Sequence, residues 1–341
     1  MKKYLLPLVF IFHLSVLSFS CSHYGFFWGQ FGEHDVDERS PSLSDFNSEK
    51  YLPDLSSQVF PVSEVYSVLI ISDLHYGSVR EDMDEEVLLE FLDDWFKKYS
   101  GAGENPDDKD LTKLPRFALN LGDTADTGRE SEFLDYLKYE EKIKALAGKY
   151  LYGESENLPV NERKFRIYSI LGNHDLYHDG SVHFMKHIFP YKSSYFFTVD
   201  ADSDKSTGAF SYFFLDTANG TMGADQLEDF RKKLEADSNP KIVLSHYPVW
   251  AGGTEPFMFM VLQNTTERNL LLSYFAKNNA RQIFEGHAHK FYGHDYNGKF
   301  RETAVGSLRY SKKEGSRDKR QCVIFTVDEK NQTVDAEVYK F

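Results

Sequence analysis

The sequence predicts an α/β protein built on an open sheet, and two observations indicate this fold class. Apolar, β-branched runs alternate with amphipathic segments along the 341 residues, a pattern typical of chains that alternate strands with helices. Polar motifs end or follow these runs: SDLH at 72–75, LGD at 121–123, GNHD at 172–175, SHYP at 245–248 and GHAH at 286–289. Open α/β sheets gather ligands outside the carboxyl ends of their strands, so we expect the motifs to form one site.

The first half of the chain repeats the order strand, motif, helix three times. Its first run, VYSVLIISD, is continuously apolar and β-branched, as expected for a strand that is buried on both faces. The amphipathic segments between the runs have the length and period of helices. The expected strands are 65–73, 117–123 and 165–175, and the expected helices are 84–99, 130–147 and 181–188.

The second half of the chain continues this alternation and ends in a strand-rich third. Further strands are expected at 209–217, 241–246 and 281–287, with helices at 224–236 and 267–277. The run CVIFTV, which begins at Cys322, predicts a core strand. Two polar stretches that contain Gly or Pro, 100–115 and 148–164, are interpreted as surface insertions.

The composition is that of a globular protein with an acidic surface. Hydrophobic residues make up 41% and charged residues 27% of the chain, and the net charge is −14. A negative field repels nucleic-acid backbones, so we expect no extended nucleic-acid binding. A small anionic substrate therefore needs a local cation.

The N-terminus has the pattern of an export signal over residues 1–20. Lys2 and Lys3 precede an apolar stretch at 5–19, which is short for a membrane span of about 20 residues. LSFSC, which ends at Cys21, resembles a bacterial lipobox and predicts membrane attachment through a lipidated Cys21 in the cell envelope. Ser18 and Ser20 equally fit ordinary signal cleavage, which would give a soluble secreted protein.

A tether and N-terminal strap are expected at 21–60, before the main domain at 61–341. Purely disordered linkers seldom carry as many aromatic residues as the stretch 26–31, so part of this segment is expected to pack on the domain. Only Cys21 and Cys322 are present. A lipidated Cys21 would leave Cys322 unable to pair within the chain.

The motif residues have the chemistry of a metal site. Residues i and i+2 of a strand point to one side, so Asp73 with His75, and His287 with His289, are expected to present their side chains together. Imidazole, carboxylate and amide oxygen without thiolate suit Mn, Fe or Zn. Seven candidates exceed one coordination shell, whereas two ions about 3.5 to 4 Å apart that share a carboxylate and a hydroxide fit this number. We expect Asp123 to be the shared carboxylate.

The five motifs, in this order, resemble the signature of the calcineurin-like metallophosphoesterases over roughly residues 66–306. The resemblance implies a four-layer α/β/β/α sandwich with helices outside two packed sheets, and periodicity alone does not predict two sheets. It implies that one metal is held by Asp73, His75, Asp123 and His289. It implies that the other is held by Asp123, Asn173, His246 and His287.

The same resemblance assigns a proton donor. His174 would protonate the leaving oxygen or donate a hydrogen bond to the phosphoryl group, and Asp175 would orient it. Two divalent ions lower the pKa of a water, and a hydroxide that bridges them is the expected nucleophile. We therefore predict a two-metal hydrolase of phosphodiesters or phosphomonoesters, whose small phosphorylated substrate could be a nucleotide or a lipid headgroup. The alternative is a non-catalytic, surface-binding lipoprotein that retains the fold.

Other polar residues leave alternatives open. Asp126 stands where the related purple acid phosphatases carry a metal-bound tyrosine, which argues against a purple ferric site; Asp126 and Asp216 are expected to cap turns or support ligands. His183 and His187, four residues apart, are interpreted as a solvated helix face rather than a further metal site. The basic run 309–320 predicts a solvated hairpin, with guidance of an anionic substrate as the alternative.

Overall fold

The computed structural model describes residues 33–55, 63–78, 81–82, 85–103, 105–155, 157–201, 208–250, 261–311 and 320–341. The expected signal peptide, Cys21 and the aromatic stretch 26–31 lie outside these residues, as do residues 312–319 of the basic run. Across the described ranges, every helix is too short or too polar to cross a membrane.

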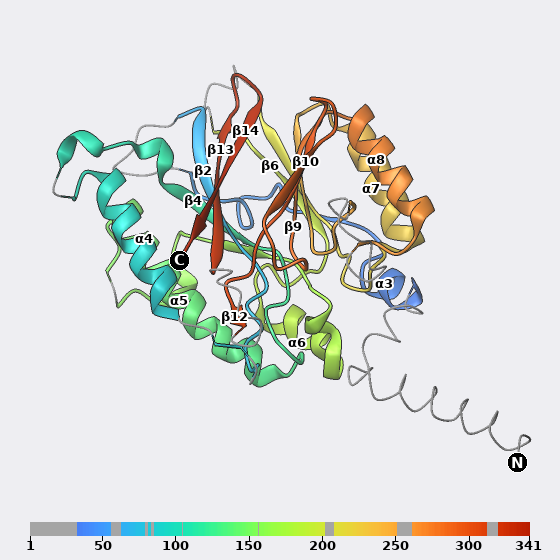
Figure 1. Ribbon diagram of the computed structural model, residues 1–341, viewed down its shortest axis with the longest axis horizontal. Coiled ribbons are helices and arrows are strands. Elements are labelled where there is room, and N and C mark those ends of the chain that lie inside the picture. The colour runs from blue at the N-terminus through green and yellow to red at the C-terminus, as the bar shows by residue number, and fades with distance from the viewer. Residues whose placement is uncertain are drawn as a thin grey trace, which may run out of the picture.

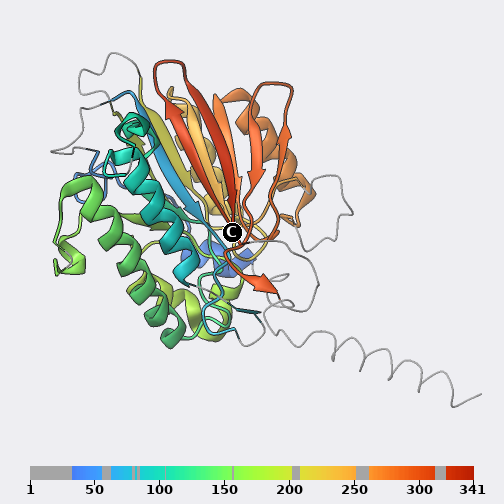
Figure 2. The same cartoon turned by 60° about the vertical axis from the view of Figure 1, so that its left-hand side comes forward.

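Two sheets form the centre of the molecule (Figures 1 and 2). One has the strand order β14-β13-β2-β4-β5, with the bounds Thr333–Lys340, Gln321–Asp328, Val65–Ile71, Pro115–Asn120 and Ile167–Ser169. The other has the order β1-β6-β7-β8-β9-β11-β10, with the bounds Ser44–Asp45, Tyr195–Val199, Phe210–Phe214, Lys241–Ser245, Ala280–Glu285, Arg301–Ala304 and Tyr292–Asp295. A small ribbon pairs β3, Glu81–Asp82, with β12, Tyr310–Ser311.

Helices cover the outer face of each sheet, so the expected four-layer α/β/β/α sandwich is confirmed (Figure 1). The helices α4, Glu85–Ser100, and α5, Glu130–Tyr152, lie on the five-stranded sheet. The helices α7, Ala224–Ala236, and α8, Thr265–Lys277, lie on the seven-stranded sheet. The other helices in the described ranges are α3, Glu33–Arg39, α6, Gly180–His187, and the 3-10 turns Pro106–Asp108, Leu111–Lys113, Val160–Glu162 and His174–Asp179.

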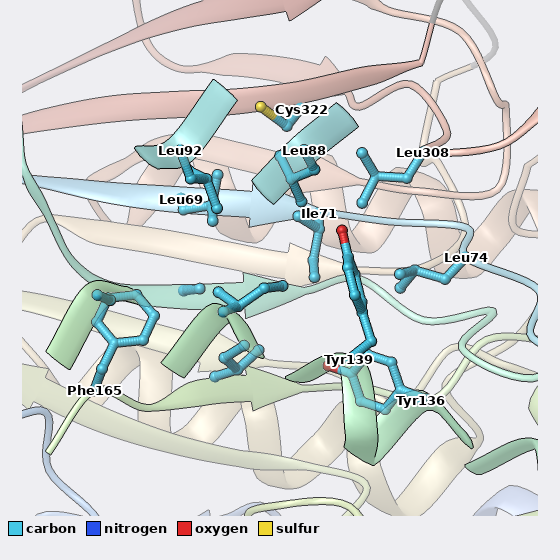
Figure 3. Packing of buried hydrophobic residues seen from close by; sticks show 14 of the residues in the cluster. Leu69, Ile71, Leu74, Leu88, Leu92, Tyr136, Tyr139, Phe165, Leu308 and Cys322 are labelled. Atoms are coloured by element: carbon cyan, nitrogen blue, oxygen red, sulfur yellow. The ribbon is translucent and has the colours of Figure 1, made fainter. Parts of the chain in front are cut away.

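Three layers of apolar side chains hold these four layers together. On β2, Leu69 and Ile71 point toward α4 and α5, where they meet Leu88 and Leu92 (Figure 3). Val68 and Ile70, on the other side of the same strand, enter the core between the two sheets. Because both faces of β2 are buried, its sequence is a continuous apolar run rather than an alternating one.

The seven-stranded sheet follows the same rule. Ile242 and Leu244 of β8 face the core between the sheets, whereas Val243 packs in the cluster that includes Phe230 of α7 and Phe275 of α8. Successive strand residues point to opposite faces. The central parallel strands of each sheet, such as β2 and β8, are therefore buried on both faces, and their ends are available for a site.

The N-terminal segment that the structure describes packs on the seven-stranded sheet. Its side chains Val36, Leu43 and Phe46 are buried, and β1 pairs in parallel with β6. Figure 1 shows α3 beside the end of α7. Within 21–60, residues 33–46 therefore form a strap that adds a strand to the sheet.

The structure corrects several expected elements. The helix α5 continues to Tyr152, with Leu151 buried, and ends at Gly153, whose φ of 66° lies in the left-handed region that glycine tolerates. Residues 148–152 are therefore part of a packed helix and not of a surface insertion. The sequence patterns did not identify β6, β10, β11 and β14, although β14 alternates between exposed and half-buried residues as an edge strand does.

Candidate metal centre

The seven predicted ligands lie at the carboxyl ends of parallel strands from both sheets. Asp73 and His75 follow β2, Asp123 follows β4 and Asn173 lies beyond β5, and these three strands run parallel. On the other sheet, His246 follows β8, and His287 and His289 follow β9, which is parallel to β8. The site therefore lies where the ends of the two sheets meet.

The backbone around the ligands corrects the expected strand geometry. Asp73, His75, Asp123, His287 and His289 all have positive φ values, between 48° and 64°. Extended strands have negative φ, so the spacing i and i+2 does not act here through strand alternation. Non-glycine residues adopt this conformation at a cost that surrounding contacts must offset, and such residues cluster at functional sites.

One group of ligand atoms comes from Asp73, His75, Asp123 and His289, whose donor atoms all lie within 4.8 Å of one another. Nε2 of His75 is 3.1 Å from Nε2 of His289, which is in turn 3.2 Å from Oδ1 of Asp73. Facing imidazole nitrogens and carboxylate oxygens are the donors that divalent transition metals accept. The donors of this group therefore fit a metal ion.

A second group contains Asp123, His246 and His287, again with all donor atoms within 4.8 Å. Oδ1 of Asn173 lies 3.1 Å from Nε2 of His246, which brings the amide to the same place. The ring of His287 stacks on Tyr247 with a centroid separation of 4.0 Å. All seven predicted ligands are thus brought together in two groups, and Asp123 belongs to both.

Buried negative charge favours cations in this centre. Asp73 and Asp123 are 0% and 1% exposed. Burial alone would raise the pKa of Asp123, but the neighbouring imidazoles of His246, His174 and His75 hold it well below its usual range. Burial would lower the pKa of His246, but Asp123 and Asp73 raise it to about 9. A metal would displace this proton, since a ligating imidazole is neutral.

Hydrogen bonds from neighbouring segments fix the carboxylate of Asp73. Oδ2 accepts a bond of 2.6 Å from Ser72 Oγ, and the backbone N–H of His287 donates to both carboxylate oxygens at 3.1 Å. The backbone oxygen of Asp73 accepts from Ser307 Oγ at 2.8 Å. Such supporting contacts orient a ligand before an ion arrives.

The predicted ligand His246 is fixed on both sides of its ring. Its Nδ1 donates to the backbone oxygen of Leu121 at 2.7 Å, so Nε2 faces Asp123 and Asn173. Its backbone N–H donates to Oγ1 of Thr217 at 3.1 Å. Ring and backbone are therefore both set by partners outside the SHYP motif.

His174 lies at the edge of the centre, and its side chain is 22% exposed. Its ring meets that of His75 edge-on, with centroids 4.5 Å apart. Its Nδ1 donates to the backbone oxygen of Asp126 at 2.7 Å, and its backbone N–H donates to Oδ1 of Asp123 at 2.8 Å. This position, beside the ligands but more open than Asp123, suits a group that exchanges protons with a substrate.

Asp175, which the resemblance makes the residue that orients His174, bonds the backbone of two neighbouring loops. Its carboxylate is fully buried and accepts from the backbone N–H of Ala125 at 2.7 Å and of Gly172 at 2.9 Å. Burial and the neighbouring Asp123 raise the pKa of Asp175 to about 7. Asp175 therefore fixes the loops after β4 and β5, whereas the ring nitrogen of His174 bonds the backbone of Asp126.

Asp126 is the residue near the site whose place the sequence left open. Its Oδ1 lies 3.3 Å from Nδ1 of His75 and 3.9 Å from Nδ1 of His174. Burial would raise the pKa of Asp126, but His75 and His174 lower it. The carboxylate thus faces His75 at ion-pair distance from the side opposite Nε2, where carboxylates orient histidines that bind metals. The sequence motif GDTADTG contains Asp126, but the spacing of Asp126 from LGD does not predict which histidine ring lies beside it.

His187 and Arg309 lie outside the two groups of predicted ligands. Nε2 of His187 lies 2.6 Å from Oε1 of Glu130, which also accepts from Lys186 at 2.7 Å, so this carboxylate is already paired. Among the described residues, the groups that could hold a metal do not include His183 or His187. In the basic run, Arg309 is buried and its charge is one of those that lower the pKa of Asp126, which differs from the expected solvated hairpin.

Comparisons with known proteins agree with this architecture. Residues 66–291 match the family described as calcineurin-like phosphoesterase. A dimetal phosphatase from Danio rerio has a similar structure, at 10% identity and a TM-score of 0.52, over 81% of this chain and 99% of that one. A 5'-nucleotidase from Candida albicans matches at 13% identity and a TM-score of 0.45, over 81% of this chain and 52% of that one. The sequence matches none of the curated proteins with which it was compared.

Proposed function

This chain belongs to the calcineurin-like phosphoesterase family, and we propose that it hydrolyses phosphate esters with two metal ions. One observation carries the proposal. Oδ2 of Asp123 lies 3.6 Å from Nε2 of His75 and 3.5 Å from Nε2 of His246, so one carboxylate stands between two groups of donors. A shared carboxylate is the usual link of a two-metal hydrolytic site.

In this proposal each ion has four ligands, and Asp123 is common to both sets. Both sets mix carboxylate with imidazole, and the second adds an amide oxygen, which suits Mn, Fe or Zn. The first ion is held by Asp73, His75, Asp123 and His289. The second ion is held by Asp123, Asn173, His246 and His287.

Bound divalent ions would polarise the phosphoryl oxygens, make a water acidic enough to attack phosphorus near neutral pH and offset charge in the transition state. The side chains around the two proposed ions differ in their exposure to solvent. Asp123 and His246 are buried, whereas the side chains of His289 and His174 are 38% and 22% exposed. We therefore place the entry of the substrate on the side of His289 and His174.

His174 is the proposed proton donor. The hydrogen bond from its Nδ1 to the backbone oxygen of Asp126 fixes the ring, since a carbonyl oxygen only accepts. Nε2 is then the atom that can pass a proton to the leaving oxygen. Departure of an alcohol or phenol as a neutral product removes the charge that otherwise opposes cleavage.

An assay of metal-reconstituted protein tests the function. Metal-free chain loaded with Mn²⁺ or Zn²⁺ is given an aryl phosphodiester and the matching monoester, followed by nucleotides and phosphorylated lipid headgroups. The proposal expects metal-dependent turnover of at least one ester and its loss in Asp123→Asn, with normal turnover in Asp94→Asn, a matched control on the exposed side of α4. Failure on every ester with both ions bound contradicts the proposal and favours a binding protein that retains the fold.

We also propose that the chain is exported and is attached to the cell envelope through a lipid on Cys21. The support is the sequence pattern of residues 1–21, with its two lysines, apolar stretch and small residues before the cysteine. The mass of the mature N-terminus tests this. A diacylated Cys21 is expected, and an unmodified residue 21 rules the anchor out.

A further inference from the structure

A buried ion pair connects the N-terminal strap to the edge of the metal centre. Nε and Nη2 of Arg39 donate to Oδ2 and Oδ1 of Asp216, at 2.7 and 2.9 Å, and Nη2 also donates to Oδ1 of Asn219 at 2.7 Å. The side chains of Arg39 and Asp216 are 8% and 0% exposed. A paired, two-bond contact of this kind fixes orientation as well as distance.

Asp216 is held firmly from its other sides as well. Ser40, also in the strap, donates through Oγ to Oδ2 of Asp216 at 2.8 Å. The backbone N–H of Asp216 donates to Oε1 of Gln226 at 2.9 Å. The position of residue 216, just beyond β7, is therefore set jointly by the strap and by α7.

The next residue, Thr217, connects Asp216 to the proposed metal ligand His246 through hydrogen bonds. Its Oγ1 accepts from the backbone N–H of His246 and of Tyr247, each at 3.1 Å, and lies 3.1 Å from Oγ of Ser245. Thr217 is fully buried. A displacement of Thr217 would therefore move the backbone from which the His246 ring projects.

We propose that Arg39 is a positioning residue for the ion held by His246, acting through Asp216 and Thr217. The proposal rests on the proposed function, because it assumes that this ion is one of two. The hydrogen bonds of Arg39 described above go to Asp216 and Asn219, and its effect is confined to one group, since His75 is anchored by Asp126 and His289 by Asp73 instead.

Removing the guanidinium has a defined consequence. The carboxylate of Asp216 would stay buried without its cation, which is costly, and would turn toward other donors. This change shifts the turn that contains Thr217. Lysine offers one ammonium in place of a planar fork and cannot reach both carboxylate oxygens and Asn219 in the same way. Loss of such supporting contacts typically weakens metal binding by about 10- to 100-fold.

The test is a calorimetric titration of metal-free, full-length protein with Mn²⁺, together with the melting temperature and the ester assay. Wild type is expected to bind two ions. Arg39→Ala is expected to bind one of them about 10- to 100-fold more weakly, Arg39→Lys to fall between, and Glu38→Ala, a control on the exposed side of the same helix, to match wild type. A folded Arg39→Ala that binds both ions as wild type does, or binds both equally weakly, overturns the inference.

A second variant keeps the test decisive if Arg39→Ala does not fold. Thr217→Val keeps the shape of the side chain and removes the acceptor of the two N–H groups. The same one-site loss is expected, and two wild-type sites overturn the inference. A wild-type chain that binds two Mn²⁺ ions but cleaves no ester contradicts the proposed function alone. A wild-type chain that binds no Mn²⁺ contradicts both.

Discussion

Asp123 and His246 meet with 3.5 Å between Oδ2 and Nε2, although they come from different sheets. Asp123 follows β4 of the five-stranded sheet, and His246 follows β8 of the seven-stranded sheet. An ion bound between them would connect the ends of the two sheets. Such an ion would serve the stability of the fold as well as the proposed chemistry.

Removal of metal should therefore destabilise the protein. Each ion that binds only the folded chain adds about 2.7 kcal/mol at a free concentration 100 times its Kd. A change of 1 kcal/mol shifts the Tm by about 2–4 °C in domains of roughly 150–250 residues. We expect chelation to lower the Tm by roughly 5 °C or more. Calorimetry with and without a chelator measures this. A Tm that is unchanged after verified loss of metal would argue against ions at the junction of the sheets.

Replacement of His174 should separate metal binding from turnover. His174→Ala removes the proposed proton donor while the seven ligands remain, so we expect unchanged metal content and a kcat lowered by about 10²- to 10⁴-fold. His178→Ala, at an exposed position four residues away, is the matched control. Elemental analysis and steady-state kinetics decide, and a variant that loses its metal shows that His174 is a ligand instead.

Replacement of Asp126 should affect His75 more than His174. Asp126→Asn removes the carboxylate 3.3 Å from Nδ1 of His75, but it keeps the backbone oxygen that accepts from His174. We expect the ion on the His75 side to bind about 10- to 100-fold more weakly, with the other ion little changed. Mn²⁺ titration measures this, with Asp94→Asn as control. Equal loss at both ions would indicate a general effect on the fold.

The site was predictable in its membership but not in its geometry. The five motifs name all seven residues that gather at the centre, because ligands of such sheets lie just beyond the strands. The local conformation at Asp73 and His287 was not predictable, since their positive φ is imposed by contacts between distant loops. The bond from His174 to the backbone of Asp126 likewise depends on how two loops meet.

The limits of the fold prediction have similar causes. A strand such as β2 has the same apolar sequence whether its second face meets helices or a sheet, so two sheets followed only from the family resemblance. The extension of α5 to Tyr152 had a local signal in Gly153. The ion pair of Arg39 and Asp216 joins residues 177 positions apart, so no local sequence pattern could predict it.

The metal content and activity of Asp123→Asn, measured beside wild type, test the central claim most directly. Among the described residues, Asp123 is the carboxylate that the two groups of predicted ligands share. We predict two metal ions per wild-type chain, and in the variant weaker binding of both ions together with loss of metal-dependent ester hydrolysis. A wild-type chain that is fully active with one ion, or a variant that keeps both ions and its activity, would contradict the two-metal account.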